Sequence, residues 1–342
     1  MRSIRVRAAA LLVALALGAC SGRPRVDALP VDEAVLHGSI ERGLACVARM
    51  YDGDSFRDDY LRFEYPGEAI ESPLPGYRLT YRILDAYFIV LMIRQAGVPP
   101  GEARSLFDRA EAATAALVPQ WRRKGIYNLR REPVHGGIAL DTYAILAVLR
   151  RDPEMGRVVE AGLDGDGWLA ADFYVGDEAF RRLADESWAV RALLVAGSPK
   201  GLEALHGLCR HVAQALDSET NPVARAYLVL HAMEAVADLP ANDSSFDEAR
   251  RLLREEALRL LRSERIRHDT LALGNLVGAL VHGRAVPVGS LSPDIRELMR
   301  RQDREGCWTV SLDPDDASGR VFDTLRMVLT LGQYERITRG GE

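Results

Sequence analysis

The chain has 342 residues, 48% of them hydrophobic, and a formal net charge of −5 at pH 7. This length and apolar content suffice for one large core or two small ones. The negative charge argues against nucleic acid and anionic lipid headgroups as partners, since both are themselves negative.

The first element is a secretory signal. Arg2, Arg5 and Arg7 precede an apolar run over residues 8–17, and this order is typical of signal peptides. The run is shorter than the roughly 20 residues that a helix needs to span a bilayer. It is therefore expected to direct export rather than to cross the membrane.

The run ends in Leu-Gly-Ala-Cys, which resembles the lipobox of bacterial lipoproteins. The resemblance implies a cleaved signal peptide over residues 1–19 and a lipid bilayer anchor on acylated Cys20, with residues 20–31 as a tether. Removal of the three arginines lowers the net charge from −5 to −8. Ser21 favours the outer membrane, facing the periplasm, if the host has two membranes. An ordinary cleaved signal with a chance cysteine is the alternative.

From residue 32 to 338 the pattern is helical almost throughout, which predicts an all-α protein of one domain. Two kinds of segment alternate. Amphipathic segments fall near residues 33–50, 101–118, 154–163, 200–216, 246–263 and 292–303. Segments that are apolar nearly all round fall near residues 79–97, 137–150, 184–197, 221–237, 268–282 and 319–335.

Helices of the apolar kind must be covered on most sides, so they are expected inside and the amphipathic ones outside. About six outer–inner hairpins then follow one another at a period of roughly 40 to 55 residues, which is typical of repeat architectures. An open solenoid would need polar caps at both ends. The strong contrast between the two kinds of helix favours a closed α/α toroid.

Inner helices of a toroid run in one direction, so their N-termini meet at one mouth of its cavity. Acidic residues near these starts predict an acidic ring: Asp141, Asp185 or Glu186, Asp269 and Asp323. One interpretation gives Asp141, Asp323 and Glu186 acid–base work, like the paired carboxylates of glycoside hydrolases. The other is structural, because Asp is a favoured N-cap and first-turn acids suit the helix dipole.

Further candidates lie near the same mouth. His135, in a glycine-containing loop, is a candidate general base or a loop histidine bonded to backbone. A long connection rich in aromatics, acids and prolines is expected to be a lid or binding segment. Aromatic side chains could stack on a sugar or peptide ligand, although packing is their commoner role: Tyr77, Tyr143, Trp168 and Trp188.

The stretch RRQDREGCWTVS joins the last outer segment to the last inner one. Its Gln302, Asp303, Gly306 and Trp308 resemble the QW-type repeat of the terpene cyclase and protein prenyltransferase superfamily. The resemblance implies an α/α toroid in which the Gln caps helix ends and the ring packs on a neighbouring hairpin. Weaker echoes follow the first and third outer segments at Asp52, Gly53 and Phe56 and at Asp164, Gly165, Gly167 and Trp168. The turn is thus expected to fasten helices rather than to contact a ligand.

The chemistry of that superfamily transfers poorly. Asp313, Asp315 and Asp316 match the spacing of the cyclase Asp-x-Asp-Asp motif, which implies Asp315 as an acid, but a solvated turn is the alternative. The prenyltransferase zinc pattern is not recognisable, and no cofactor or metal is expected. A serine nucleophile elbow, a phosphate loop, a Rossmann glycine pattern and His-Glu-x-x-His are also missing from the sequence.

Cys46, Cys209 and Cys307 remain beyond the lipidation site. An oxidising compartment permits one disulfide among them and leaves one thiol, and the sequence leaves the pairing open.

Three functions remain open. The first is binding of a glycan or peptide in an acidic, aromatic cavity without catalysis. The second is a carbohydrate hydrolase or lyase, which predicts a carboxyl with a raised pKa and a partner within reach. The third is an envelope scaffold that binds a protein partner, which predicts a filled core and an exposed apolar patch.

Overall fold

The computed structural model describes residues 30–51, 86, 89–91, 93–94, 102–124, 144–148, 150–162, 179–239, 244–308 and 317–340. By their contacts the residues divide into two units, Met1–Pro30 and Val31–Glu342, and every element below belongs to the second. The predicted all-α class is confirmed: the described part consists of helices and turns, and none of its residues forms a strand.

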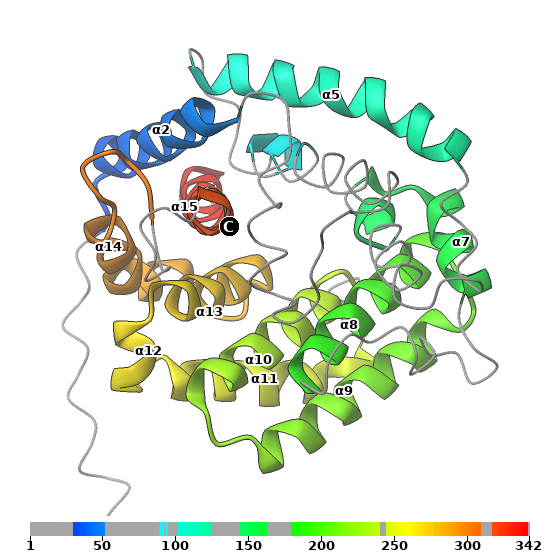
Figure 1. Cartoon of the computed structure of the whole chain (residues 1–342). Helices are drawn as coiled ribbons and strands as arrows, with labels where there is room; N and C mark the ends of the chain where they lie inside the picture. The colour runs from blue at the N-terminus through cyan, green and yellow to red at the C-terminus, as the bar shows by residue number, and fades with distance from the viewer. Residues whose placement is uncertain are drawn as a thin grey trace, which may run out of the picture. The chain divides into compact units, whose positions relative to one another are not determined.

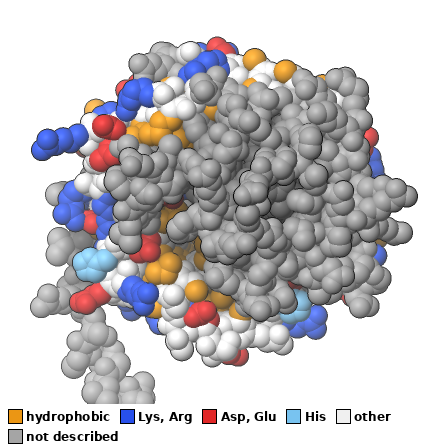
Figure 2. Space-filling model, viewed as in Figure 1, with side chains coloured by type: hydrophobic (Ala, Val, Ile, Leu, Met, Phe, Trp, Pro, Cys, Tyr) orange, Lys and Arg blue, Asp and Glu red, His pale blue; other side chains and the backbone are white. Residues whose placement is uncertain are grey.

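The amphipathic helices begin and end close to the predicted positions. They are α2 (Glu33–Met50), α5 (Glu102–Lys124), α7 (Pro153–Gly162), α9 (Gly201–Ser218), α11 (Asp247–Leu260) and α14 (Ser292–Arg300). Ion pairs at helical spacing run along their exposed sides, as where Arg251 meets Glu248 and Glu255 on α11. On the face shown in Figure 2, arginines and carboxylates accordingly lie side by side on the described surface.

The apolar helices, here called the inner helices, are α8 (Ala179–Ala196), α10 (Pro222–Ala237), α13 (Thr270–His282) and α15 (Ala317–Gly340). Within residues 79–97 and 137–150 the described residues are also helical. α10 begins with Asn221 accepting from the Val223 N–H and with Pro222 at its first position. Short helices α12 (Glu264–His268), η2 (Ser244–Phe246) and η3 (Val288–Leu291) complete the described elements. No described helix is both long and apolar enough to cross a bilayer.

The inner helices contact one another in chain order, α8 with α10, α10 with α13 and α13 with α15 (Figure 1). Outer helices pack on them: α7 and α9 on α8, α11 on α10, and α14 on α13. The inner helices therefore bury most of their surface, and α13 buries every residue from Ala272 to Val277. This succession of pairs fits both repeat architectures, and the closed toroid stays a prediction.

The first and last described helices are joined. α2 packs along α15 (Figure 1), and Gly43 makes this possible, since a Cβ there would lie 2.7 Å from Val328 and 2.9 Å from Trp308. A disulfide links Cys46 of α2 to Cys307, with a Cα–Cα distance of 5.6 Å and a sequence separation of 261. Cys209 keeps a free thiol. The pairing that the sequence left open is thus Cys46 with Cys307.

The turn over residues 302–308 fastens α14 to α2. The Gln302 Oε1 accepts from Ser39 Oγ at 2.8 Å and from Arg42 Nη2 at 2.6 Å, and its Nε2 donates to the Ser39 carbonyl at 2.8 Å. Gly306 has φ +86°, and a Cβ there would lie 2.5 Å from the Arg42 carbonyl oxygen. Only glycine suits both that conformation and that contact.

Trp308 extends the same attachment to two more helices. Its ring is fully buried, and its Nε1 donates to the Leu298 carbonyl of α14 at 2.7 Å. Its backbone N–H donates to Thr324 Oγ1 of α15 at 3.0 Å. The expectation that this turn connects helices is confirmed by these contacts.

Replacement of both Cys46 and Cys307 by alanine is expected to lower the free energy of unfolding by about 4 kcal/mol, because the disulfide closes a very long loop in the unfolded chain. Urea unfolding measures the loss. A reductant should bring the wild type to the stability of the double variant and leave the double variant unchanged. Equal sensitivity of both proteins to the reductant would contradict this role.

Candidate functional site

Much of the predicted mouth lies outside the described residues. This holds for Asp141, His135, Tyr77, Tyr143, Trp168, Asp315 and the lipidation residue Cys20, and for the side chain of Asp185. Three acids of the predicted ring are described, Asp269, Glu186 and Asp323, and the structure does not place them in one ring at the helix starts. The predicted stacking residue Trp188 is described as well.

Asp269 is the N-cap of α13. Its Oδ1 accepts from the Ala272 N–H at 2.8 Å, which satisfies a backbone donor that the helix itself cannot pair. The structural interpretation of this residue is therefore confirmed.

Glu186 and Asp323 do not lie in the first turns of their helices, which corrects their predicted positions. α8 begins at Ala179 and α15 at Ala317, so both acids lie about two turns into the helix. Residues 179–185 contain neither Gly nor Pro, and nothing in them ends the helix before Glu186. Asp323 is buried and lies one turn before Arg326.

Glu186 joins α8 to α9. Its Oε1 lies 2.8 Å from His211 Nδ1, and its side chain is 8% exposed while the His211 ring is 41% exposed. Burial raises the pKa of the Glu186 carboxyl, and His211 offsets part of the rise. The enzyme hypothesis predicts a carboxyl that has a raised pKa and a partner within reach, and Glu186 with His211 matches that description. Glu186 does not, however, line the cavity among the inner helices.

That cavity, the inner-helix cavity, has a volume of about 150 Å³. Every inner helix contributes polar side chains to it, at spacings of three, four or seven residues, which place them on one face of each helix. They are Trp188 and Arg191 from α8, Glu234 and Asp238 from α10 and its C-cap, Asn275 and His282 from α13, and Arg326, Thr330 and Gln333 from α15, together with Arg151. The described lining therefore carries both signs of charge, whereas the sequence predicted an acidic cavity.

Glu234 is the centre of a buried charge network. Its Oε2 lies 3.3 Å from Arg191 Nη1, and its Oε1 lies 3.2 Å from Arg326 Nη2. Arg191 also binds Asp238 through Nε at 2.5 Å, and Arg326 donates to Asn275 Oδ1 at 3.4 Å. One carboxylate thus connects guanidinium groups from α8 and α15.

These charges persist over a wide pH range. Burial alone would raise the pKa of Glu234, but Arg326 and Arg191 overcome it and hold that pKa at about 2. Burial alone would lower the pKa of Arg191, but Asp238 and Glu234 raise it above its ordinary value. Glu234 therefore stays ionised and cannot serve as a general acid near neutral pH.

Two neutral histidines border the network. Burial lowers the pKa of His231 to about 4 and also lowers the pKa of His282. Gln333 Nε2 lies 3.4 Å from His282 Nδ1; with the amide as donor, Nδ1 accepts and Nε2 carries the proton. The His282 Nε2 is buried and has no hydrogen-bond partner among the described residues. In that tautomer, His282 of the cavity lining carries a donor that no described residue satisfies.

Arg151 holds an unusual backbone conformation at the cavity. It follows a helix that ends at residue 150 and has φ +50°, while the Asp152 N–H donates to the Ala147 carbonyl at 2.9 Å. Glycine is the usual residue at this point, and α8 has Gly197 there with φ +66°. The Arg151 side chain forms no hydrogen bond or ion pair within the described part of the chain.

Trp188 provides an aromatic surface in the same cavity. The Arg191 guanidinium carbon lies 4.6 Å from the centre of its ring, a cation–π contact, and the ring is half-buried. Of the predicted ligand-binding aromatics, Trp188 is the one that the described structure places at the cavity.

The charge network was missed by the sequence reasoning, although a signal exists. The inner helices read as apolar, yet single charges interrupt them at Arg191, Glu234 and Arg326. Charged residues are almost never fully buried unless they are paired. Lone charges in covered helices therefore predict that they pair with one another, without showing which pairs form.

No group of three or more metal-ligating side chains occurs within the described ranges. The Cys209 thiol is partly buried, which raises its pKa to about 11 and makes it a poor ligand or nucleophile.

A scan against protein-family models finds none that matches the chain, and no curated protein sequence matches it significantly. The resemblance to the terpene cyclase and prenyltransferase superfamily therefore rests on the residues quoted for it.

Replacement of Glu234 by Gln is expected to lower the free energy of unfolding by about 3 to 5 kcal/mol, because it leaves two buried guanidinium groups without their shared carboxylate. Chemical denaturation measures the change. Glu248→Gln, which breaks an exposed pair with Arg251, is the control and should change stability little. Similar losses in the two variants would contradict the importance of the buried network.

Stability is also expected to fall as the pH is lowered from about 6.5 to 4. In this window the unfolded chain binds a proton at His231, and the folded chain, with its pKa of about 4, does not. The loss amounts to about 3 kcal/mol at 1.36 kcal/mol per pKa unit. His231→Phe should remove this part of the pH dependence in urea unfolding. Ser187 Oγ lies 3.3 Å from His231 Nδ1, and Ser187→Ala, which keeps the imidazole ring, should preserve it. An unchanged slope in His231→Phe would contradict the assignment.

Proposed function

We propose that the protein is a lipid-anchored cell-envelope protein whose inner-helix cavity binds part of a glycan or peptide ligand without catalysis. At about 150 Å³ the cavity is below the roughly 300 Å³ of small drug-sized pockets, so it suits one sugar ring or one amino-acid side chain of a longer ligand.

The observation that carries this proposal is at His282, which lines the cavity and whose buried Nε2 has no hydrogen-bond partner among the described residues. An unsatisfied buried donor costs about 1 to 3 kcal/mol. A hydroxyl, carbonyl or carboxylate oxygen of a ligand that reached this nitrogen would remove that cost on binding. Both glycans and peptides present such oxygens.

Arg151 and Trp188 support the same interpretation. A residue other than glycine at positive φ is held there against its backbone preference, and such positions cluster at functional sites. The Arg151 guanidinium, which no described residue pairs, offers further donors to ligand oxygens. The Trp188 ring offers an apolar face on which a sugar or an aliphatic side chain can lie.

The proposed architecture and location have separate support. α2, the first outer helix, packs on α15, the last inner helix, a contact that a closed toroid makes and an open solenoid does not. The Cys46–Cys307 disulfide suits an oxidising compartment. Export through the signal at residues 1–19 and acylation of Cys20 would bring the chain there.

A carbohydrate hydrolase or lyase is the second candidate, because Glu186 has a raised pKa beside His211. Against it, Glu186 lies between α8 and α9 rather than at the cavity, and Glu234 stays ionised. Turnover that disappears in Glu186→Gln would decide in favour of the enzyme.

The test is a thermal-shift screen of the full-length protein against glycans and peptides. We expect a ligand that raises the melting temperature of the wild type and of the surface variant Arg251→Gln, but not of His282→Phe or Trp188→Ala. A ligand that shifts all four proteins equally would place binding elsewhere. No shift across the panel would favour the envelope scaffold and refute this proposal.

A further inference from the structure

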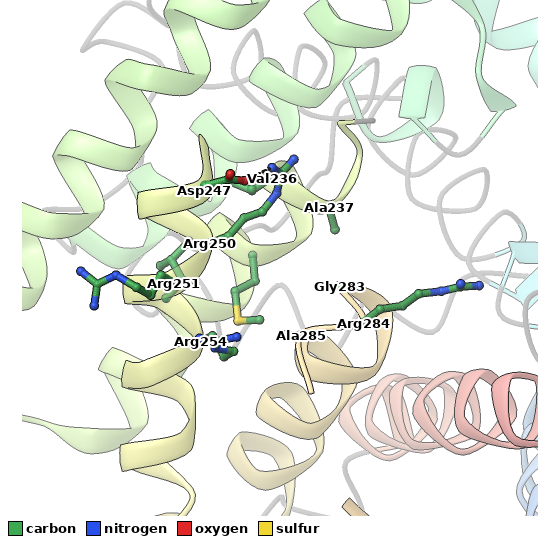
Figure 3. Close-up of a pocket in the computed structure, with 11 residues that line it drawn as sticks. Val236, Ala237, Asp247, Arg250, Arg251, Arg254, Gly283, Arg284 and Ala285 are labelled. Carbon is green, nitrogen blue, oxygen red and sulfur yellow. Dashed lines mark hydrogen bonds and ion pairs between the residues drawn. The ribbon is translucent and has the colours of Figure 1, made fainter. Parts of the chain in front are cut away.

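A second cavity, the α11 cavity, has a volume of about 400 Å³ and lies where the ends of α10 and α13 meet the start of α11 (Figure 3). It shares no described lining residue with the inner-helix cavity. Its apolar lining includes Met233, Val236 and Leu253. Its volume falls within the range of about 300 to 1,000 Å³ typical of small-molecule sites.

Arginines border this cavity. Arg250, Arg251 and Arg254 come from α11 and Arg284 follows α13, with Asp247 as the carboxylate of the lining. Arg250 Nη1 lies 3.1 Å from Asp247 Oδ1, and Arg251 points away from the cavity toward its own helix partners (Figure 3). The side chains of Arg254 and Arg284 form no hydrogen bond or ion pair with any described residue. Among the described residues, two positive charges at the cavity therefore have no carboxylate partner.

Arg284 also holds a backbone conformation that glycine favours. Its φ is +46°, at the C-terminal cap of α13, where the Ala285 N–H donates to the Leu280 carbonyl at 3.0 Å. The preceding Gly283 has φ −75°, which any residue adopts. Glycine and arginine thus stand in the reverse of the order that the backbone prefers.

The helix dipole does not account for this order. A cation near the C-terminus of α13 is favourable, but an arginine at position 283 would provide the same attraction without a positive φ. A strained backbone conformation of this kind persists where the surrounding structure or the function requires that side chain at that position. Because Arg284 lies at the edge of the α11 cavity, we relate the requirement for its guanidinium to that cavity.

We propose that the α11 cavity binds an anionic amphiphile, with a carboxylate or phosphate held by Arg254 and Arg284 and an alkyl chain lying against Met233, Val236 and Leu253. Guanidinium groups bind such oxyanions through two parallel hydrogen bonds. In Figure 3 the Arg284 side chain extends away from α11, so joint binding of one oxyanion requires the side chain to rotate toward Arg254. A free amphiphile and a membrane-lipid headgroup present the same chemistry.

The first test is isothermal titration of the full-length protein with dodecyl phosphate below its critical micelle concentration. We expect binding that is at least tenfold tighter than that of inorganic phosphate, which lacks the chain, and of dodecyltrimethylammonium, which has the opposite charge. Binding of the cationic amphiphile with equal affinity would overturn the proposal.

Variants distinguish the contribution of the Arg284 side chain to binding from its effect on stability. Arg284→Gly relieves the backbone and is expected to melt at a higher temperature while binding dodecyl phosphate at least tenfold more weakly. Arg254→Gln should weaken binding similarly, and the outward-pointing Arg251→Gln should leave it unchanged. Wild-type affinity in a more stable Arg284→Gly protein would overturn the role of Arg284 and with it the proposed site.

Vesicles with and without an anionic phospholipid identify the source of the ligand. Binding to anionic vesicles that Arg284→Gly weakens would indicate a headgroup in the membrane, whereas binding of monomeric dodecyl phosphate alone would indicate a free amphiphile. Vesicle binding that is identical in wild type and Arg284→Gly, without monomer binding, would refute the α11 cavity as the site.

Discussion

The pairing of Glu234 with two arginines constrains everything built around the inner helices. These helices are apolar on most sides, yet α8 and α15 each bring a guanidinium group into the region that they enclose. One carboxylate of α10 neutralises part of both charges, while Asp238 binds Arg191 Nε and Asn275 binds Arg326 Nε.

Stability alone does not explain such a network. Buried ion pairs can often be replaced by apolar side chains of similar volume at no loss, because desolvation offsets their attraction. A set of charges retained inside apolar helices therefore suggests a use for a polar interior. The inner-helix cavity, lined by an imidazole whose Nε2 no described residue pairs, gives that interior a definite place in the fold.

The sequence predicted the helices better than the site. Periodicity located α2, α7 and α10 to within one or two residues, because burial repeats along the chain and leaves a local pattern. The acidic ring was less well predicted, because its positions depended on helix starts, and α8 begins earlier than its charged residues indicated. The partners of Arg191 and Arg326 come from other helices, and no local pattern identifies them.

The closing disulfide bears on the order in which the chain matures. Synthesis runs from the N-terminus, so Cys46 is complete long before Cys307, and Cys209 appears between them. In an oxidising compartment Cys46 therefore meets Cys209 before it meets Cys307. A Cys46–Cys209 bond would have to be exchanged for the native one through attack by a thiolate. Packing of the partly buried Cys209 against the helical core raises the pKa of its thiol, which makes it a weaker competitor for Cys46 once α9 has docked.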